Sequence, residues 1–226
     1  SISNSGTITG LNGNVIIDAN GSISNFGYFI IPVNCIFNNY GLFTNASDAA
    51  SVTNNSSNFN NSGIIDISYG TLTNAGTGII TGFNGNFIID ANGSISNSGT
   101  FIIPIDCSFN NSGVFTNASI DASFTNYSDN FNNYGTLDIS YGTFSNSGNI
   151  NLKTVYTGLP SVLNIYENGI FVNDNNLYLS SIPGDYETDV NINNYSMDFI
   201  NNGLINYTNY GDGHPNINNK ANAIMF

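Results

Sequence analysis

The chain has 226 residues, of which 8% are charged, 40% hydrophobic and 13% aromatic. Two basic residues stand against fifteen acidic ones, giving a formal net charge of −13. Because nucleic acids and anionic membrane surfaces are bound through several Lys or Arg side chains, the composition argues against both as partners. No apolar run approaches the roughly 20 residues that a bilayer-spanning helix needs, which argues against membrane insertion. The composition instead indicates a folded chain with an amide-rich and hydroxyl-rich surface.

A long internal repeat covers the first part of the chain. Sliding the sequence by 72 residues, the interval from Cys35 to Cys107, aligns "ITGLNGNVIIDANGSISNFG" with "ITGFNGNFIIDANGSISNSG" without a gap. The match ends near residue 148. Ungapped repetition is typical of stacked repeat proteins. We therefore expect a repetitive region over 1–148, made of two 72-residue repeats, and a divergent region over 149–226.

A shorter motif, h-x-N-x-G with h apolar or aromatic, recurs inside the long repeat. Gly tolerates positive φ and Asn is the next most tolerant residue, so N-x-G predicts a corner between short strands that point apolar residues inward. The average spacing predicts coils of about 18 residues. The predicted corner residues are Asn4, Gly6, Asn25, Gly27, Asn39, Gly41, Asn61, Gly63, Asn74, Gly76, Asn97, Gly99, Asn111, Gly113, Asn133, Gly135, Asn146 and Gly148.

Short strands joined by regularly spaced corners predict an all-β parallel β-helix, or β-solenoid. Asn residues stacked at equivalent corners could then bond their amides along the stack. An antiparallel alternative stays open, because "VIIDANGSIS" and "FIIDANGSIS" place Asn-Gly between apolar runs, a strong hairpin signal. Each long repeat would in that case be a small β-sandwich, giving tandem antiparallel domains.

"NSGTITG" followed by "GNG", together with recurrent N-x-G-x-I lines, resembles the passenger regions of bacterial autotransporter adhesins and filamentous-haemagglutinin-like secreted proteins. The resemblance covers about residues 1–150. It implies a right-handed β-helix displayed outside the cell, and it carries over no functional residue. Viral surface fibres show the same sequence style, so we expect an extracellular location or a cell or virion surface. A chain that starts at Ser1 without Met suits a mature secreted form or a fragment of a longer protein.

Cys35 and Cys107 occupy the same place in the two long repeats. Four coils at about 4.8 Å each would hold them roughly 19 Å apart, whereas a disulfide needs Cα atoms within about 7 Å. We expect both to be unpaired core thiols, with a bridge to a neighbouring subunit as the alternative.

Acidic residues supply the candidate metal site. Asp185, Glu187 and Asp189 alternate in "GDYETDV", so on a strand their carboxylates would face one side and could bind calcium; a solvated acidic turn is the alternative. The repeat-equivalent pairs Asp18 with Asp90 and Asp66 with Asp138 are expected to cap turns more than to bind metal. No other cofactor is expected.

Catalytic motifs are not evident in the sequence. His214 follows Asp212 in "YGDGHPN", but no nucleophile motif accompanies the pair, and we expect no enzyme. The recurrent tyrosines Tyr40, Tyr69, Tyr134 and Tyr141 could stack on surface glycans or could fill the core.

The two ends of a solenoid expose unpaired strand edges. The first coil shows no cap, whereas 149–226 has the atypical composition of a cap or assembly region. We therefore expect a non-catalytic building block of an extracellular fibre or surface layer that assembles with itself end to end. An adhesin or glycan-binding module is the alternative.

Overall fold

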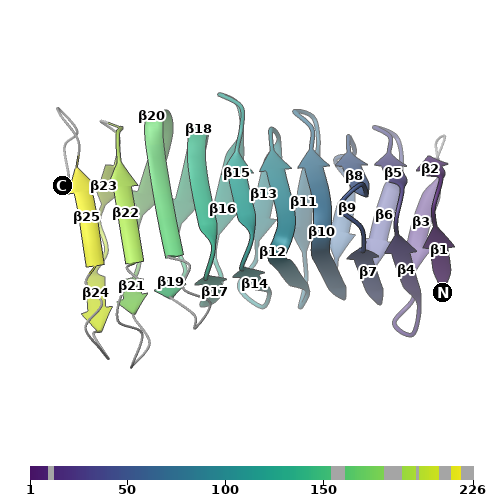
Figure 1. The fold of residues 1–226 in the computed structure, drawn as a ribbon, viewed down its shortest axis with the longest axis horizontal. Coiled ribbons are helices and arrows are strands. Elements are labelled where there is room, and N and C mark those ends of the chain that lie inside the picture. Colours follow the sequence, from purple (N-terminus) through teal and green to yellow (C-terminus); the bar gives the residue numbers. More distant parts are fainter. Residues whose placement is uncertain (10–12, 154–160, 181–189, 197–198, 209–214, 220–226) are drawn as a thin grey trace.

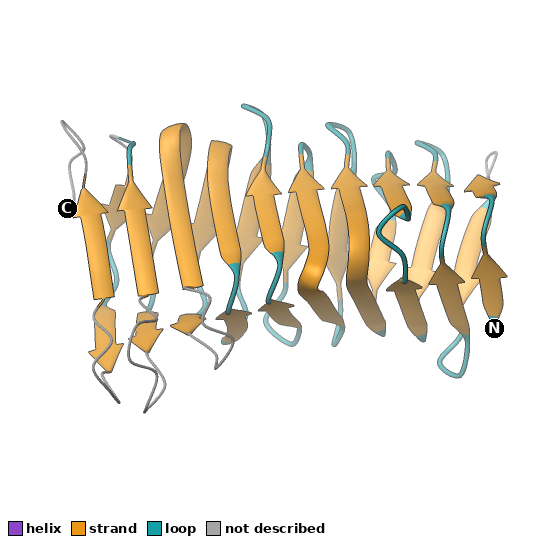
Figure 2. Cartoon of the chain, in the orientation of Figure 1, coloured by secondary structure: helices purple, strands orange, loops and turns teal. Residues whose placement is uncertain are grey.

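The computed structural model describes residues 1–9, 13–153, 161–180, 190–196, 199–208 and 215–219. These residues form a 25-stranded sheet that winds around the long axis of the molecule, with β1 and β25 at opposite ends (Figure 1). Strands and connecting loops make up the described chain (Figure 2). Each strand pairs in parallel with the equivalent strand of the next coil, for example β1 with β4 and β4 with β7. The β-solenoid is confirmed, and the antiparallel sandwich alternative is wrong.

Each coil has three strands, which lie on three faces that we call A, B and C. Face A contains β1 (Ile2–Asn4), β4 (Ser22–Asn25), β7 (Leu42–Asn45), β14 (Ser108–Asn111), β17 (Asn130–Asn133), β19 (Ile150–Lys153), β21 (Leu177–Ser180) and β24 (Ile205–Thr208). Face B contains β2 (Thr7–Thr9), β5 (Tyr28–Ile31), β8 (Ser51–Asn54), β15 (Val114–Asn117), β22 (Val190–Asn194) and β25 (Pro215–Asn219). Face C contains β3 (Asn14–Ile17), β6 (Ile36–Asn39), β9 (Phe59–Asn61), β11 (Ile79–Gly82), β13 (Thr100–Ile103), β16 (Ser123–Asn126) and β23 (Phe199–Asn201). Longer strands bend at a corner: β10 (Ile64–Asn74) and β12 (Asn86–Asn97) serve faces A and B, and β18 (Thr136–Asn146) and β20 (Ser161–Asn173) serve faces B and C.

A coil takes about 22 residues, so the predicted length of about 18 is wrong. Along face A, Ile23 is in register with Phe43, and Phe43 with Ile65. The coil length predicted from the h-x-N-x-G motif is too short because the motif marks only some of the corners. Other corners have Ser in place of Gly, as in "FTNAS" at 43–47.

The 72-residue repeat does not contain a whole number of coils. From β4 to the first part of β12 the chain runs through ten strand segments, while each coil uses three. Ile23 therefore lies on face A, and its repeat equivalent Ile95 lies on face B. The second copy is displaced by one face, and its residues still fit because the three faces have the same alternating pattern of inward and outward side chains.

Alternate side chains on every face point inward and fill the core. Most strands show the same burial pattern, in which the second and fourth residues are buried and the others are partly exposed. On face C, Phe37 stacks on Phe59 with ring centroids 4.5 Å apart, and Phe124 stacks on Phe144 at 4.6 Å. Such stacked rings contribute beyond their buried area.

Buried asparagines form ladders along the solenoid, as the repeated corner motif predicted. The amide of Asn74 donates to Asn97, and Asn97 donates in turn to Asn117, each at 2.8 Å. The ladder Asn4, Asn25, Asn45 follows the same pattern on face A, and Asn126, Asn146, Asn173, Asn201 follow it on face C. Ladder oxygens also accept backbone N–H groups two residues on, as Asn25 does from Gly27 at 3.3 Å. A ladder asparagine can thus satisfy both a corner and the contact between coils. Asn111 is the exception among the described residues: it follows Ile89 on face A and donates to Asn133, but its buried Oδ1 has no donor.

Close approach between coils, more than backbone conformation, requires glycine at the predicted N-x-G corners other than Gly6 and Gly76; a Cβ on Gly76 would lie 3.8 Å from its nearest neighbour. Among the described glycines, positive φ occurs at Gly70 and Gly142, both 67°, and neither belongs to the predicted corner set. A Cβ on Gly63 would lie 2.2 Å from the carbonyl oxygen of Gly41 in the preceding coil. At Gly6, in the first coil, a Cβ would have nothing within 4 Å. The prediction that positive φ selects these glycines is wrong.

Breaking an internal ladder is expected to destabilise the whole rod. Replacing Asn97→Ala removes a donor and an acceptor from a fully buried chain of amides. The Asn74 amide loses its acceptor in the next coil, and Asn117 Oδ1 loses its donor. We expect the free energy of unfolding to fall by about 2–4 kcal/mol. Asn60→Ala is the matched control, because its 3.1 Å bond to Asn38 is solvent-exposed and its loss should cost under about 0.5 kcal/mol. Equal losses in urea denaturation would contradict a dominant role for the buried ladders.

Candidate functional site

The predicted calcium ligands Asp185, Glu187 and Asp189 lie outside the described residues, as do Asp212 and His214. Within the described part of the chain, no three His, Cys, Asp or Glu side chains gather as metal ligands would. That same part contains no helix long and apolar enough to cross a membrane.

The repeat-equivalent aspartates have different surroundings. Asp66 accepts a hydrogen bond from the Ser68 hydroxyl at 2.8 Å, which is a local turn contact. Asp138 instead accepts from the Asn164 amide of the next coil at 2.7 Å. Burial, and secondarily the negative charge of Asp66, raise the pKa of Asp90. Asp66 and Asp90, which come from different copies of the long repeat, are thus brought near each other at the corner between faces A and B.

The two cysteines are free and buried. Cys35 precedes β6 on face C and Cys107 precedes β14 on face A, so they lie at different corners, ten strand segments apart, where four whole coils were predicted. The Ser56 and Ser128 hydroxyls donate to the carbonyl oxygens of Cys35 and Cys107, each at 2.5 Å. Burial raises the pKa of the Cys107 thiol, which keeps that sulfur protonated and weakly nucleophilic.

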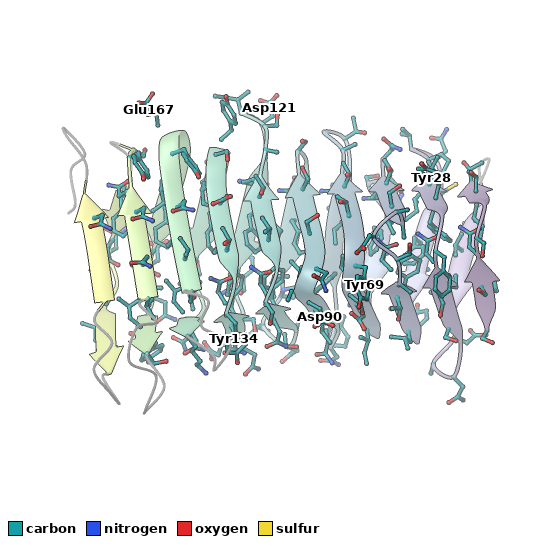
Figure 3. The ribbon with its side chains drawn as sticks, in the orientation of Figure 1. Tyr28, Tyr69, Asp90, Asp121, Tyr134 and Glu167 are labelled. Carbon is teal, nitrogen blue, oxygen red and sulfur yellow. The ribbon has the colours of Figure 1, made fainter. Side chains whose placement is uncertain are left out.

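Three successive coils place tyrosines at the corner between faces B and C. Ser140, Tyr141, Tyr166, Glu167 and Tyr195 line an open pocket of about 410 Å³, which we call the tyrosine corner. The rings of Tyr166 and Tyr195 are nearly parallel, at 7°, with centroids 5.7 Å apart. Glu167 projects at the edge of the molecule beside them (Figure 3). The arrangement offers a flat aromatic surface with a carboxylate and hydroxyls beside it.

An outward ladder of polar side chains runs along face B next to the tyrosine corner. Asn164 donates to Asp138, Asn193 to Asn164 at 2.8 Å, and Asn218 to Asn193 at 2.9 Å. Burial raises the pKa of Asp138, although the bond from Asn164 lowers it. Burial, followed by the charges of Asp138 and Tyr195, raises the pKa of Tyr166. The Tyr166 phenol is therefore protonated at neutral pH and can donate a hydrogen bond.

Sequence reasoning found one of the three tyrosines. Tyr141 belongs to the tyrosine corner and is 42% exposed, whereas Tyr40, Tyr69 and Tyr134 lie at other corners. Tyr166 and Tyr195 each follow the last inward residue of face B in their coil, Ile165 and Asn194. They occupy the same position in successive coils although no shared sequence motif surrounds them. The signal was hidden because coils after β18 are longer: Leu137 pairs with Leu163, and Leu163 with Ile192.

The core opens at both ends of the described solenoid. Core side chains in between are at most 4% exposed, but Ile2 is 54% exposed and Ile217 is 40% exposed. Ile8, Val15 and Ile205 are also only partly buried against the core. In the described part of the chain, β1, β2, β24 and β25 each pair along one edge alone. These edges combine unpaired backbone groups with exposed apolar side chains.

The fold places the chain in the class of parallel β-solenoids. Comparison with protein-family models, with curated proteins and with solved structures found no match. Of the resemblance to autotransporter and haemagglutinin-like passengers, the β-solenoid architecture is therefore the part that is established.

Removing the charge of Asp138 is expected to change how stability depends on pH. Because the folded state raises this pKa, it binds the proton more tightly than the unfolded state, and the free energy of unfolding falls as pH rises from about 4 through the raised value. Asp138→Asn should flatten that slope and stabilise the protein at pH 7, since an amide can also bond Asn164. Urea denaturation at pH 4 and pH 7 measures this, with exposed Asp121→Asn as control. If Asp138→Asn left the pH dependence of the free energy of unfolding unchanged, a raised Asp138 pKa would not be its cause.

Proposed function

We propose that the protein is a non-catalytic structural building block of an extracellular fibre or surface layer, on a cell or virion, that assembles through its solenoid ends. The observation that carries the proposal is the contrast between a closed core along the rod and an open core at its ends. Exposed strand edges pair readily with other chains, and exposed inward isoleucines add apolar area to be buried.

Charge supports contact at the ends over contact along the sides. Acidic side chains such as Asp48, Asp121, Asp129 and Glu167 lie at the corners along the rod, and with a net charge of −13 they oppose side-by-side packing. The terminal strands β1, β2, β24 and β25 contain no charged residue. An end-to-end contact therefore meets no side-chain charge from these four strands.

Reducing the apolar area of the first coil should weaken assembly. Ile8→Asn places an amide at the open core position of β2, and we expect association to weaken about tenfold, as losing roughly 1.4 kcal/mol of apolar burial predicts. Thr7→Asn, at the exposed outward position beside it, is the control and should leave association unchanged. Sedimentation velocity over a concentration series, with negative-stain microscopy, measures the effect. A monomer at all concentrations for the unsubstituted chain would refute the proposal.

The tyrosine corner favours a second candidate function, the binding of a surface glycan. Parallel Tyr166 and Tyr195 provide a flat apolar surface for a sugar ring, and Glu167 and Ser140 provide polar contacts beside it. Asp138 and Glu167 give the tyrosine corner acidic side chains. Lys153, the basic side chain in the described part of the chain, lies on face A, away from this corner between faces B and C. These charges favour a neutral glycan over an anionic one.

Glycan binding predicts a specific effect of one tyrosine. Tyr166→Ala should weaken binding of neutral oligosaccharides about two- to tenfold, because it removes an aromatic contact of roughly 0.5–1.5 kcal/mol. Tyr40→Ala, a 50% exposed tyrosine at another corner, is the control. A glycan array followed by calorimetry on any neutral ligand provides the measurement, and equal binding by both variants would exclude the tyrosine corner as the site.

A further inference from the structure

We infer that a second copy of this chain stacks on the first with its face A continuing face A and its face B continuing face B, so that β1 of one copy pairs with β24 of the next and β2 with β25. The inference rests on the proposed end-to-end assembly and adds its register.

On faces A and B, each open core position of the first coil has an open counterpart at the last described coil. The first coil also has partly buried Val15 on face C, where Phe199 of the last described strand is covered. On face A, Ile2 is exposed at the first coil and Ile205 is only partly buried at the last. On face B, partly buried Ile8 corresponds to Ile217. All four point inward by register, since Ile2 and Ile8 pair with Ile23 and Phe29, and Ile205 and Ile217 pair with Leu177 and Ile192. Stacking Ile2 on Ile205 and Ile8 on Ile217 closes the core on faces A and B across the junction.

The sequence alone would favour a different register. "FINNG" at Phe199–Gly203 repeats the spacing of "ISNSG" at Ile2–Gly6, which would seat β1 on β23 and rotate the second copy by one face. Phe199, however, is 0% exposed, so its core position is already covered. Among the strands that the structure describes at this end, only the unrotated register places each open position of β1 and β2 against another open position.

The backbone edges meet with compatible polarity in this register. Strands of all coils run in parallel, so placing the first coil of one copy on the last coil of another continues the parallel ladder. The contact joins two different surfaces of the same molecule, which makes it heterologous. Repeating it without closure gives a straight filament, in which faces A and B continue from one copy to the next.

Cysteine pairing across the junction tests the register. Ser3 and Asn206 are outward-facing residues of β1 and β24, and stacked strands hold Cα atoms about 4.8 Å apart, within the roughly 4.4–6.8 Å that a disulfide accepts. Ser3→Cys protein is mixed with Asn206→Cys protein and oxidised. The control mixes Ser3→Cys with Ile200→Cys, whose outward position on β23 would pair with Ser3 in the rotated register. Cys35 and Cys107 stay buried in every variant.

We expect a disulfide-linked heterodimer on a non-reducing gel in the first mixture and its loss in the control, with the bridge located by peptide mass spectrometry. A heterodimer in the control mixture alone would overturn the register. So would assemblies seen by sedimentation in which neither mixture cross-links. Absence of any assembly by the unsubstituted chain would instead overturn the proposed function itself. Circular dichroism of each variant establishes that it is folded before mixing.

Discussion

The hydrogen bond between a buried asparagine and its equivalent one coil away is the constraint on which the rest of the structure depends. An amide both donates and accepts, so identical side chains can satisfy one another without limit along a parallel stack. Burying Asn97 without such partners would be costly, and the surrounding register is therefore fixed. A shift of one residue would turn every amide outward and every outward polar side chain into the core.

Close stacking follows from the same ladders. With coils held at hydrogen-bond distance, the corner of one coil lies against the carbonyl oxygens of the coil before it, and Gly63 has no room for a side chain. The core is filled by Phe and Ile in rows, which pack well because like residues recur at like heights. The amide ladders, the glycine corners and the rows of stacked aromatic side chains thus all follow from in-register repetition.

Repetition also decided how much could be predicted from the sequence. The ungapped long repeat favoured the solenoid over the antiparallel sandwich, and h-x-N-x-G indicated the ladders, because both are local patterns repeated in register. Coil length was missed, since corners such as Asn45 use Ser in place of Gly. Tyr166 and Tyr195 were missed because their proximity depends on the lengths of irregular coils, which no local motif reveals. The open core at the ends required knowing which residues point inward.

The mismatch between ten strand segments and three per coil has a consequence for how such a chain can grow. Duplicating this unit turns whatever follows by a third of a revolution about the long axis. A surface feature carried by the unit would appear on successive edges of the lengthened rod, not in a single row. The molecule can therefore become longer and present the same chemistry in several directions by copying one stretch of sequence.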